Sequence, residues 1–146
     1  MRALVQRVSS ASVAVGPELV GSIGAGLCTF VGVTHSDESA TAERMARRLW
    51  GLRVFEDDAG LTNRSAEELG REVLVVSQFT LYADTSRGRR PSFVDAARPE
   101  HAEAVVERVV EALRSLGARV ATGRFRADMA VSLVNDGPFT VMLEVP

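Results

Sequence analysis

Residues 130–145 read AVSLVNDGPFTVMLEV, two apolar stretches separated by the run Asn135-Asp136-Gly137-Pro138. Both stretches have the length and the β-branched content of strands, so the interruption predicts a turn between two strands. Proline has no N–H to donate to a sheet, and the peptide bond before it is one of the few that can be cis. Such a turn fixes the direction of its backbone carbonyl groups. Rigid backbone of this kind suits a protein that must measure the shape of a small ligand.

The N-terminal third of the chain also has the character of strands. Short apolar runs between glycine-containing breaks predict strands at residues 3–8, 11–15, 19–23 and 27–33. Their tight connections predict an antiparallel meander. Three later runs predict a short strand at 52–55, a central buried strand at 73–77 and a strand at 119–122.

Two amphipathic segments predict helices. The first begins near Asp37 or Ser39 and ends near Leu52, and the second runs from Pro99 to a stop at Gly117. Residues 65–69 predict one further helical turn. Strands at both ends with helices between them indicate an α+β fold in a single domain of residues 1–146. We expect a mostly antiparallel sheet or open barrel with two main helices packed on its outside.

The composition is that of a globular protein, with 46% hydrophobic and 25% charged residues. No apolar run reaches the length of a membrane span and the start resembles no signal peptide, so we expect a cytoplasmic protein. The single cysteine, Cys28, lies in an apolar run, which predicts a buried, inert thiol. His35 and His101 lack metal-ligand spacing, so we expect neither a metal nor another cofactor.

All 17 basic residues are arginine, and the net charge is −2. The charge argues against binding of nucleic acid by bulk attraction. The arginine content reflects either the composition of the source genome or phosphate recognition. Three arginines gather at Arg87, Arg89 and Arg90. This segment is either a solvated loop or a clamp for an RNA backbone.

Polar side chains follow the predicted strand at 73–77. Ser77, Gln78 and Thr80 surround Phe79, which indicates either an ordinary strand end or the floor of a pocket. A hydroxyl nucleophile would need a neighbouring base, and neither histidine stands in a triad-like arrangement with these residues. A hydrolase of the serine-protease type is therefore not expected.

Four segments together resemble the D-aminoacyl-tRNA deacylases. They are Gln6–Val8, Ser77–Asp84, Gly88–Phe93 and Val131–Thr140, and the likeness extends over essentially the whole chain. The resemblance implies a hydrolase that cleaves the ester of D-aminoacyl-tRNA to free D-amino acid and tRNA. It implies that glycyl-tRNA(Ala) is also cleaved, since glycine has no side chain to reject.

The resemblance also implies a homodimer in which the Gly137–Pro138 bond is cis. This turn would reach the partner's pocket beside Ser77–Thr80, where two carbonyl groups would exclude an L side chain. Arg7, Met129 and Asn135 would support the site. The resemblance thus adds aminoacyl-tRNA and a second copy of the chain as partners, and the arginines at 87, 89 and 90 become candidates for binding the tRNA.

The implied chemistry needs little from side chains. The family picture has the 2′-hydroxyl of the tRNA assist, while the N–H groups of Phe79 and Thr80 stabilise the oxyanion. An older alternative makes Thr80 a nucleophile, and the missing base argues against it. Two other functions stay open: a module that binds the tRNA end without turnover, and a small-molecule esterase that ignores RNA.

Overall fold

The structure is a computed structural model that describes all residues, 1–146. The strands are β1 (Arg2–Val15), β2 (Glu18–Ile23), β3 (Gly26–Gly32), β4 (Arg53–Glu56), β5 (Thr62–Ser65), β6 (Glu72–Ser77), β7 (Val120–Thr122) and β8 (Ala130–Glu144). The helices are α1 (Ser39–Trp50), α2 (Ala66–Leu69), α3 (Pro99–Ser115) and the short 3₁₀ helix η1 (Phe79–Tyr82). No helix is long and apolar enough to cross a membrane.

The main sheet has the order β2-β1-β3-β6-β7, and β8 pairs with the other edge of β1. The strands β1, β2, β3 and β8 pair antiparallel, whereas β3, β6 and β7 are parallel to one another. The sheet curls so that β2 approaches β7, and the carbonyl oxygen of Thr122 lies where a side chain at Gly21 would stand. The expected α+β fold with a nearly closed barrel is confirmed.

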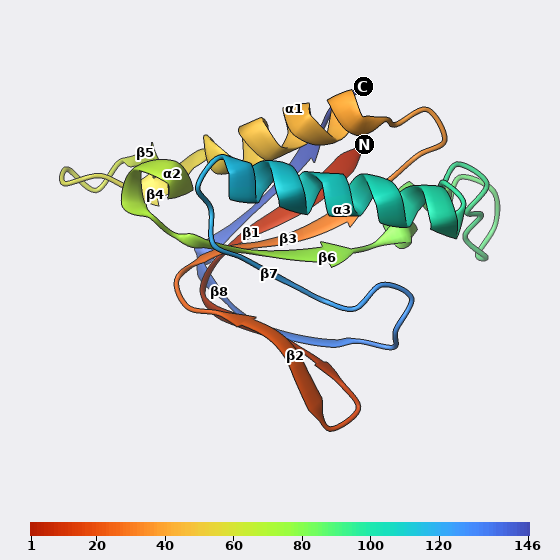
Figure 1. The fold of residues 1–146 in the computed structure, drawn as a ribbon, viewed down its shortest axis with the longest axis horizontal. Coiled ribbons are helices and arrows are strands. Elements are labelled where there is room, and N and C mark those ends of the chain that lie inside the picture. The colour runs from red at the N-terminus through yellow and green to blue at the C-terminus, as the bar shows by residue number, and fades with distance from the viewer.

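The helices α1 and α3 lie side by side on one face of the sheet (Figure 1). Their apolar stripes, with Met45, Leu49, Val109 and Leu113, bury against the sheet in the larger core. A second, smaller core that includes Cys28 fills the curl between β1, β2 and β6. The expected central position of the strand at 73–77 is confirmed, because β6 lies between β3 and β7.

Two predictions about the strands are wrong. The N-terminal strands do not form a simple meander, because β3 pairs with β1 and not with β2. The predicted strands at 3–8 and 11–15 are one bent strand, β1, whose first half pairs with β3 and whose second half pairs with β2. Because β1 is long, β2 pairs with its residues 11–15 and β3 then pairs with its residues 2–8.

The Asn135–Pro138 run is not a turn between two strands. The residues on both sides of it pair with the same strand, with Val8 opposite Asn135 and Gln6 opposite Thr140. Only Arg7 separates Gln6 from Val8, whereas residues 136–139 intervene on β8. The run is therefore a bulge of four residues opposite one in a single long edge strand.

The expected cis bond is also wrong, since no peptide bond in the structure is cis. Gly137 has φ +112°, a region that L side chains rarely adopt. The chain resumes its pairing with β1 at Thr140, after a trans Gly137–Pro138 bond. A trans amide is the more stable form when packing does not impose the other.

Candidate active site

The predicted pocket floor lines a cavity of about 680 Å³ at the end of β6. Ser77, Gln78 and Phe79 contribute to one wall. The other lining residues come from β6, the residue after β3, the segment before α3, the first turn of α3, the β7–β8 connection and the start of β8: Val33, Val76, Phe93, Ala96, Ala97, Arg98, Pro99, Ala102, Phe125, Arg126, Ala127, Met129 and Val131. Met129, one of the predicted supporting residues, belongs to this lining.

The wall formed by η1 is fixed by close packing. A side chain at Gly32 would collide with Leu81 and with the carbonyl oxygen of Gln78, so glycine at the end of β3 allows η1 to lie against the sheet. Arg2 donates from Nη1 to the carbonyl oxygen of Leu81 at 2.9 Å, and its guanidinium lies 4.6 Å from the centre of the Tyr82 ring. The turn after Ser77 is therefore held from both sides.

The motif residues differ in their surroundings. Gln78 donates from Nε2 to the hydroxyl of Thr80 at 2.5 Å, and Thr80 is exposed beside the cavity and is not part of its lining. Phe79 is 53% exposed and packs edge-on against Phe93, with 5.0 Å between ring centres. The first donor in η1 is Leu81, which donates to Gln78 at 3.3 Å. The N–H groups of Phe79 and Thr80 precede it and are left free of the helical pattern.

The lining contains no histidine, cysteine or carboxylate. His35 and His101 lie elsewhere, where each donates from Nε2 to a carbonyl oxygen at 2.7 Å, on Val94 and Asp37 respectively. Cys28 is fully buried, and burial raises the pKa of its thiol to about 11. No group of three or more metal-ligating side chains occurs in the structure.

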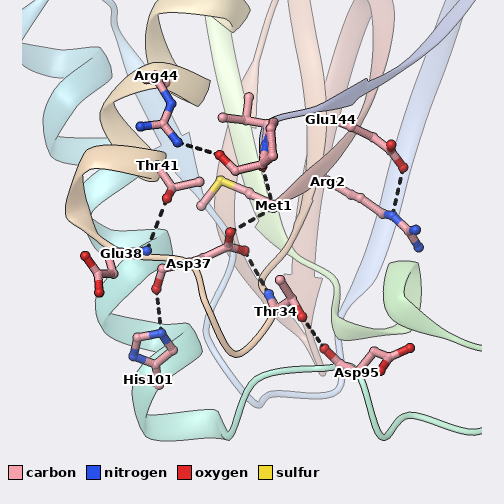
Figure 2. A network of polar contacts seen from close by, with 12 residues as sticks. Met1, Arg2, Thr34, Asp37, Glu38, Thr41, Arg44, Asp95, His101 and Glu144 are labelled. Atoms are coloured by element: carbon pink, nitrogen blue, oxygen red, sulfur yellow. Dashed lines mark hydrogen bonds and ion pairs between the residues drawn. The ribbon is translucent and has the colours of Figure 1, made fainter.

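The wall before α3 is tied to the start of the chain (Figure 2). The ammonium group of Met1 and the carboxylate of Asp37 are both buried and lie 2.9 Å apart. The other oxygen of Asp37 accepts from the N–H of Thr34 at 2.8 Å, and the hydroxyl of Thr34 donates to the carbonyl oxygen of Asp95 at 2.6 Å. The N–H of Ala97 donates to Val33 at 2.9 Å. The cavity wall is therefore anchored in the core of the fold.

Arg7 contacts the bulge in β8. It is nearly buried, and it donates to the carbonyl oxygens of Asp136 at 3.0 Å and Val54 at 2.7 Å. Its guanidinium also lies 5.1 Å from the centre of the Phe139 ring. The side-chain amide of Asn135 bridges the base of the bulge, with bonds of 3.0 Å to the carbonyl oxygen of Arg7 and 2.9 Å to that of Phe139. Both predicted supporting residues thus contact the bulge itself.

The bulge and the cavity of one chain lie apart. Arg7 pairs with Leu27 of β3. Ser77 pairs with Val31, four residues farther along the same strand. At about 3.3 Å per residue, this offset is roughly 13 Å. Neither Gly137 nor Pro138 lines the cavity. A single chain does not bring the two motifs together.

Arg87, Arg89 and Arg90 lie on an exposed loop closed by two hydrogen bonds between Asp84 and Ser92, of 2.8 and 2.9 Å. None of the three forms an ion pair. The loop joins directly to Phe93 in the cavity lining.

The family model described as D-Tyr-tRNA(Tyr) deacylase matches residues 4–144. The chain belongs to this family. A D-aminoacyl-tRNA deacylase of Symbiobacterium thermophilum is 56% identical over 99% of this chain and 95% of its own length. One of Streptomyces coelicolor is 54% identical over 99% of this chain and 100% of its own. The resemblance to D-aminoacyl-tRNA deacylases and the expectation of an enzyme are confirmed.

Two solved structures are similar to this member of the family. One, named "c-Myc DNA Unwinding Element Binding Protein", has a TM-score of 0.94 and 41% identity, covering 100% of this chain and 99% of its own. The other, named as a probable eukaryotic D-amino acid tRNA deacylase, has a TM-score of 0.84. It covers 97% of both chains at 17% identity, which supports the fold alone.

Sequence reasoning missed both charged residues of the cavity lining, Arg98 and Arg126. Neither belongs to a motif of the resemblance. The available signals were an arginine directly before the proline that begins α3, and an arginine three residues before Met129. Neither signal indicates a site by itself, because only the fold places residues 98 and 126 in the lining of one cavity.

Proposed function

We propose that this deacylase-family protein hydrolyses the ester of D-aminoacyl-tRNA, releasing free D-amino acid and tRNA. The observation that carries the proposal is the cavity itself. Its wall combines polar groups of Ser77 and Gln78 with the aromatic side chains of Phe79 and Phe93, and it contains no side chain that would act as a base. Such a site suits a substrate that is already reactive and needs positioning.

In the proposed reaction, water adds to the ester carbonyl carbon and the 3′-oxygen of the terminal ribose leaves with a proton. The N–H groups of Phe79 and Thr80 stabilise the negative charge that develops on the carbonyl oxygen. The neighbouring 2′-hydroxyl of the RNA assists the proton transfer. The Thr80 hydroxyl accepts a hydrogen bond from Gln78, so its role here is to position that side chain.

The proposal includes a homodimer with the Gly137–Pro138 bulge of one chain at the cavity of the other. The separation of bulge and cavity within one chain favours this arrangement. So does β8, a strand of 15 residues that pairs with β1 along one edge and with no strand along the other. Val134 and Met142 on this strand are 57% and 46% exposed. The unpaired N–H and C=O groups along such an edge can form hydrogen bonds with a strand of another chain.

Selectivity for D-residues would come from rigid backbone at the bulge, which Arg7 and Asn135 hold by three hydrogen bonds and an aromatic contact. With the bond before Pro138 in the trans form, this idea no longer depends on cis geometry. A backbone barrier acts on side chains of one hand and leaves glycine unaffected. We therefore extend the proposal to glycyl-tRNA(Ala).

The unpaired Arg87, Arg89 and Arg90 would contact phosphates of the tRNA. A cytoplasmic location and a single catalytic domain of residues 1–146 complete the proposal.

A second candidate is nucleic-acid binding without turnover. The name of the similar structure "c-Myc DNA Unwinding Element Binding Protein" favours it. The two candidates predict opposite effects on the ester, since a binding module shields it from water.

The test uses D-tyrosyl-tRNA at a hundredfold excess over protein. We expect release of many equivalents of free D-tyrosine per protein. A variant with a narrowed cavity, Ala96→Trp, should lose the activity and keep its affinity for the tRNA. Slower ester loss than in buffer would instead favour the binding module, and full activity in Ala96→Trp would place the reaction elsewhere.

A further inference from the structure

Arg98 and Arg126 are the only charged residues in the lining of the cavity. They come from the start of α3 and from the β7–β8 connection, two segments far apart in the sequence. Both are exposed. Arg98 forms no ion pair, and Arg126 has only a loose contact of 3.9 Å with Glu100, in which both side chains are mostly exposed. Two guanidinium groups are thus available beside the cavity.

The backbone of Arg126 is unusual. It is the only non-glycine residue with positive φ, at 63°. It occupies the third position of a turn closed by a hydrogen bond of 3.2 Å from the N–H of Ala127 to the carbonyl oxygen of Arg124. Glycine is the favoured residue at such a position. Backbone conformations of this kind concentrate at functional sites. The loose contact with Glu100 is the one ion pair that the Arg126 side chain forms.

Arg98 is also free for another task. Its backbone is extended, with φ −60° and ψ 148°, and Pro99 fixes the start of α3 after it. Its side chain makes no capping hydrogen bond. Arg98 thus lines the cavity, and its side chain is not engaged in capping α3.

The charges on α3 restrict where an anion could lie. Glu103, Glu107 and Glu111 line a neighbouring hollow of about 420 Å³ between α3 and β7. Arg114 and Arg124 line the same hollow, which therefore carries charges of both signs. The cavity lining carries only the positive charges of Arg98 and Arg126, so the cavity is the more favourable approach for a polyanion. Arginine forks match the oxygens of a phosphodiester with two parallel hydrogen bonds.

We propose that Arg98 and Arg126 together bind the phosphodiester that joins the terminal, aminoacylated adenosine to the nucleotide before it. The inference rests on the proposed function and assigns these residues the positioning of the substrate. The ester would lie at Ser77–Thr80 while the two arginines hold the phosphate at the cavity mouth. The pair is distinct from Arg87, Arg89 and Arg90, which would contact phosphates farther from the ester.

The test compares three D-tyrosine esters: that of adenosine, which has no phosphate, that of a CCA trinucleotide, and D-tyrosyl-tRNA. Arg98→Ala and Arg126→Ala should each lower kcat/KM roughly 10- to 100-fold on the two phosphate-containing substrates. The loss should appear mainly in KM and shrink at high salt. Hydrolysis of the adenosine ester should not change.

Two further variants serve as controls. Arg126→Gly relaxes the backbone while removing the guanidinium, so it should unfold no earlier than wild type and still show the loss. Arg119→Ala, an exposed arginine outside the cavity, should leave all three reactions unchanged. An equal loss on the adenosine ester, or no loss on any substrate, would overturn the phosphate contact. Wild-type protein that cleaves none of the esters would overturn the proposed function and this inference together.

Discussion

The Nε of Arg7 donates to the carbonyl oxygen of Asp136 at 3.0 Å, and its Nη2 occupies the space into which a side chain at Gly137 would point. The bulge of β8 is thus packed against a nearly buried guanidinium. Position 137 requires glycine for two reasons. Its φ is positive, and the Arg7 guanidinium lies too close to leave room for a side chain.

Gly137→Ala should therefore lower the free energy of unfolding by about 2–4 kcal/mol, from backbone strain and displaced charge-assisted hydrogen bonds. Urea denaturation measures the change. Gly24→Ala is the matched control, because its new methyl group would meet only Glu72 Oε1 at 3.6 Å. A Gly137→Ala variant as stable as the control would contradict the described packing.

Asp37→Asn should destabilise the protein by about 3–5 kcal/mol, because it leaves the buried Met1 ammonium without its counter-charge. Thermal unfolding measures the loss. Asp58→Asn, an exposed aspartate with no ion pair, should change stability by less than about 0.5 kcal/mol. Equal effects from the two substitutions would show that the ion pair contributes nothing.

The Cys28 thiol should resist alkylation in the native protein and react quickly in urea. Burial raises its pKa to about 11 in the folded state, from an ordinary value of 9.0. The neutral thiol therefore contributes stability below pH 9, which is lost as the pH rises from 9 to 11. Urea midpoints across this range should fall more steeply for wild type than for Cys28→Ala. Parallel curves, or rapid alkylation of folded protein, would contradict the burial.

Thr80→Ala should retain activity on D-tyrosyl-tRNA within about tenfold of wild type, since its hydroxyl only supports Gln78. A substrate whose terminal ribose lacks the 2′-hydroxyl should be cleaved far more slowly by both proteins. Single-turnover rates measure both effects. A fall of several orders of magnitude in Thr80→Ala would instead support a nucleophilic threonine.

The sequence predicts the local elements well, because periodicity reports which face of a segment is buried. The helix from Pro99, the central strand at 73–77 and the buried Cys28 follow from such patterns. The pairing of strands cannot be predicted in this way, because it depends on contacts between residues distant in the sequence. Nothing local indicates that β3 pairs with β1 and not β2, or that both sides of Gly137 pair with one strand.

The candidate site likewise contains residues that the sequence predicts and residues that it does not. The motif at Ser77–Thr80 can be recognised because polar residues follow a buried strand. The sequence does not assign Arg98 and Arg126 to the site, because only the fold brings these two distant segments to the lining of one cavity. The resemblance predicts a cis bond before Pro138, whereas no peptide bond in the structure is cis.

The central claim is chiral ester hydrolysis, and the most direct measurement compares initial rates of ester loss from D-tyrosyl-tRNA and L-tyrosyl-tRNA at equal concentration. The account predicts rapid loss of the D ester, with the L ester decaying at the rate seen in buffer alone. Equal loss of both, or loss of neither, would contradict it.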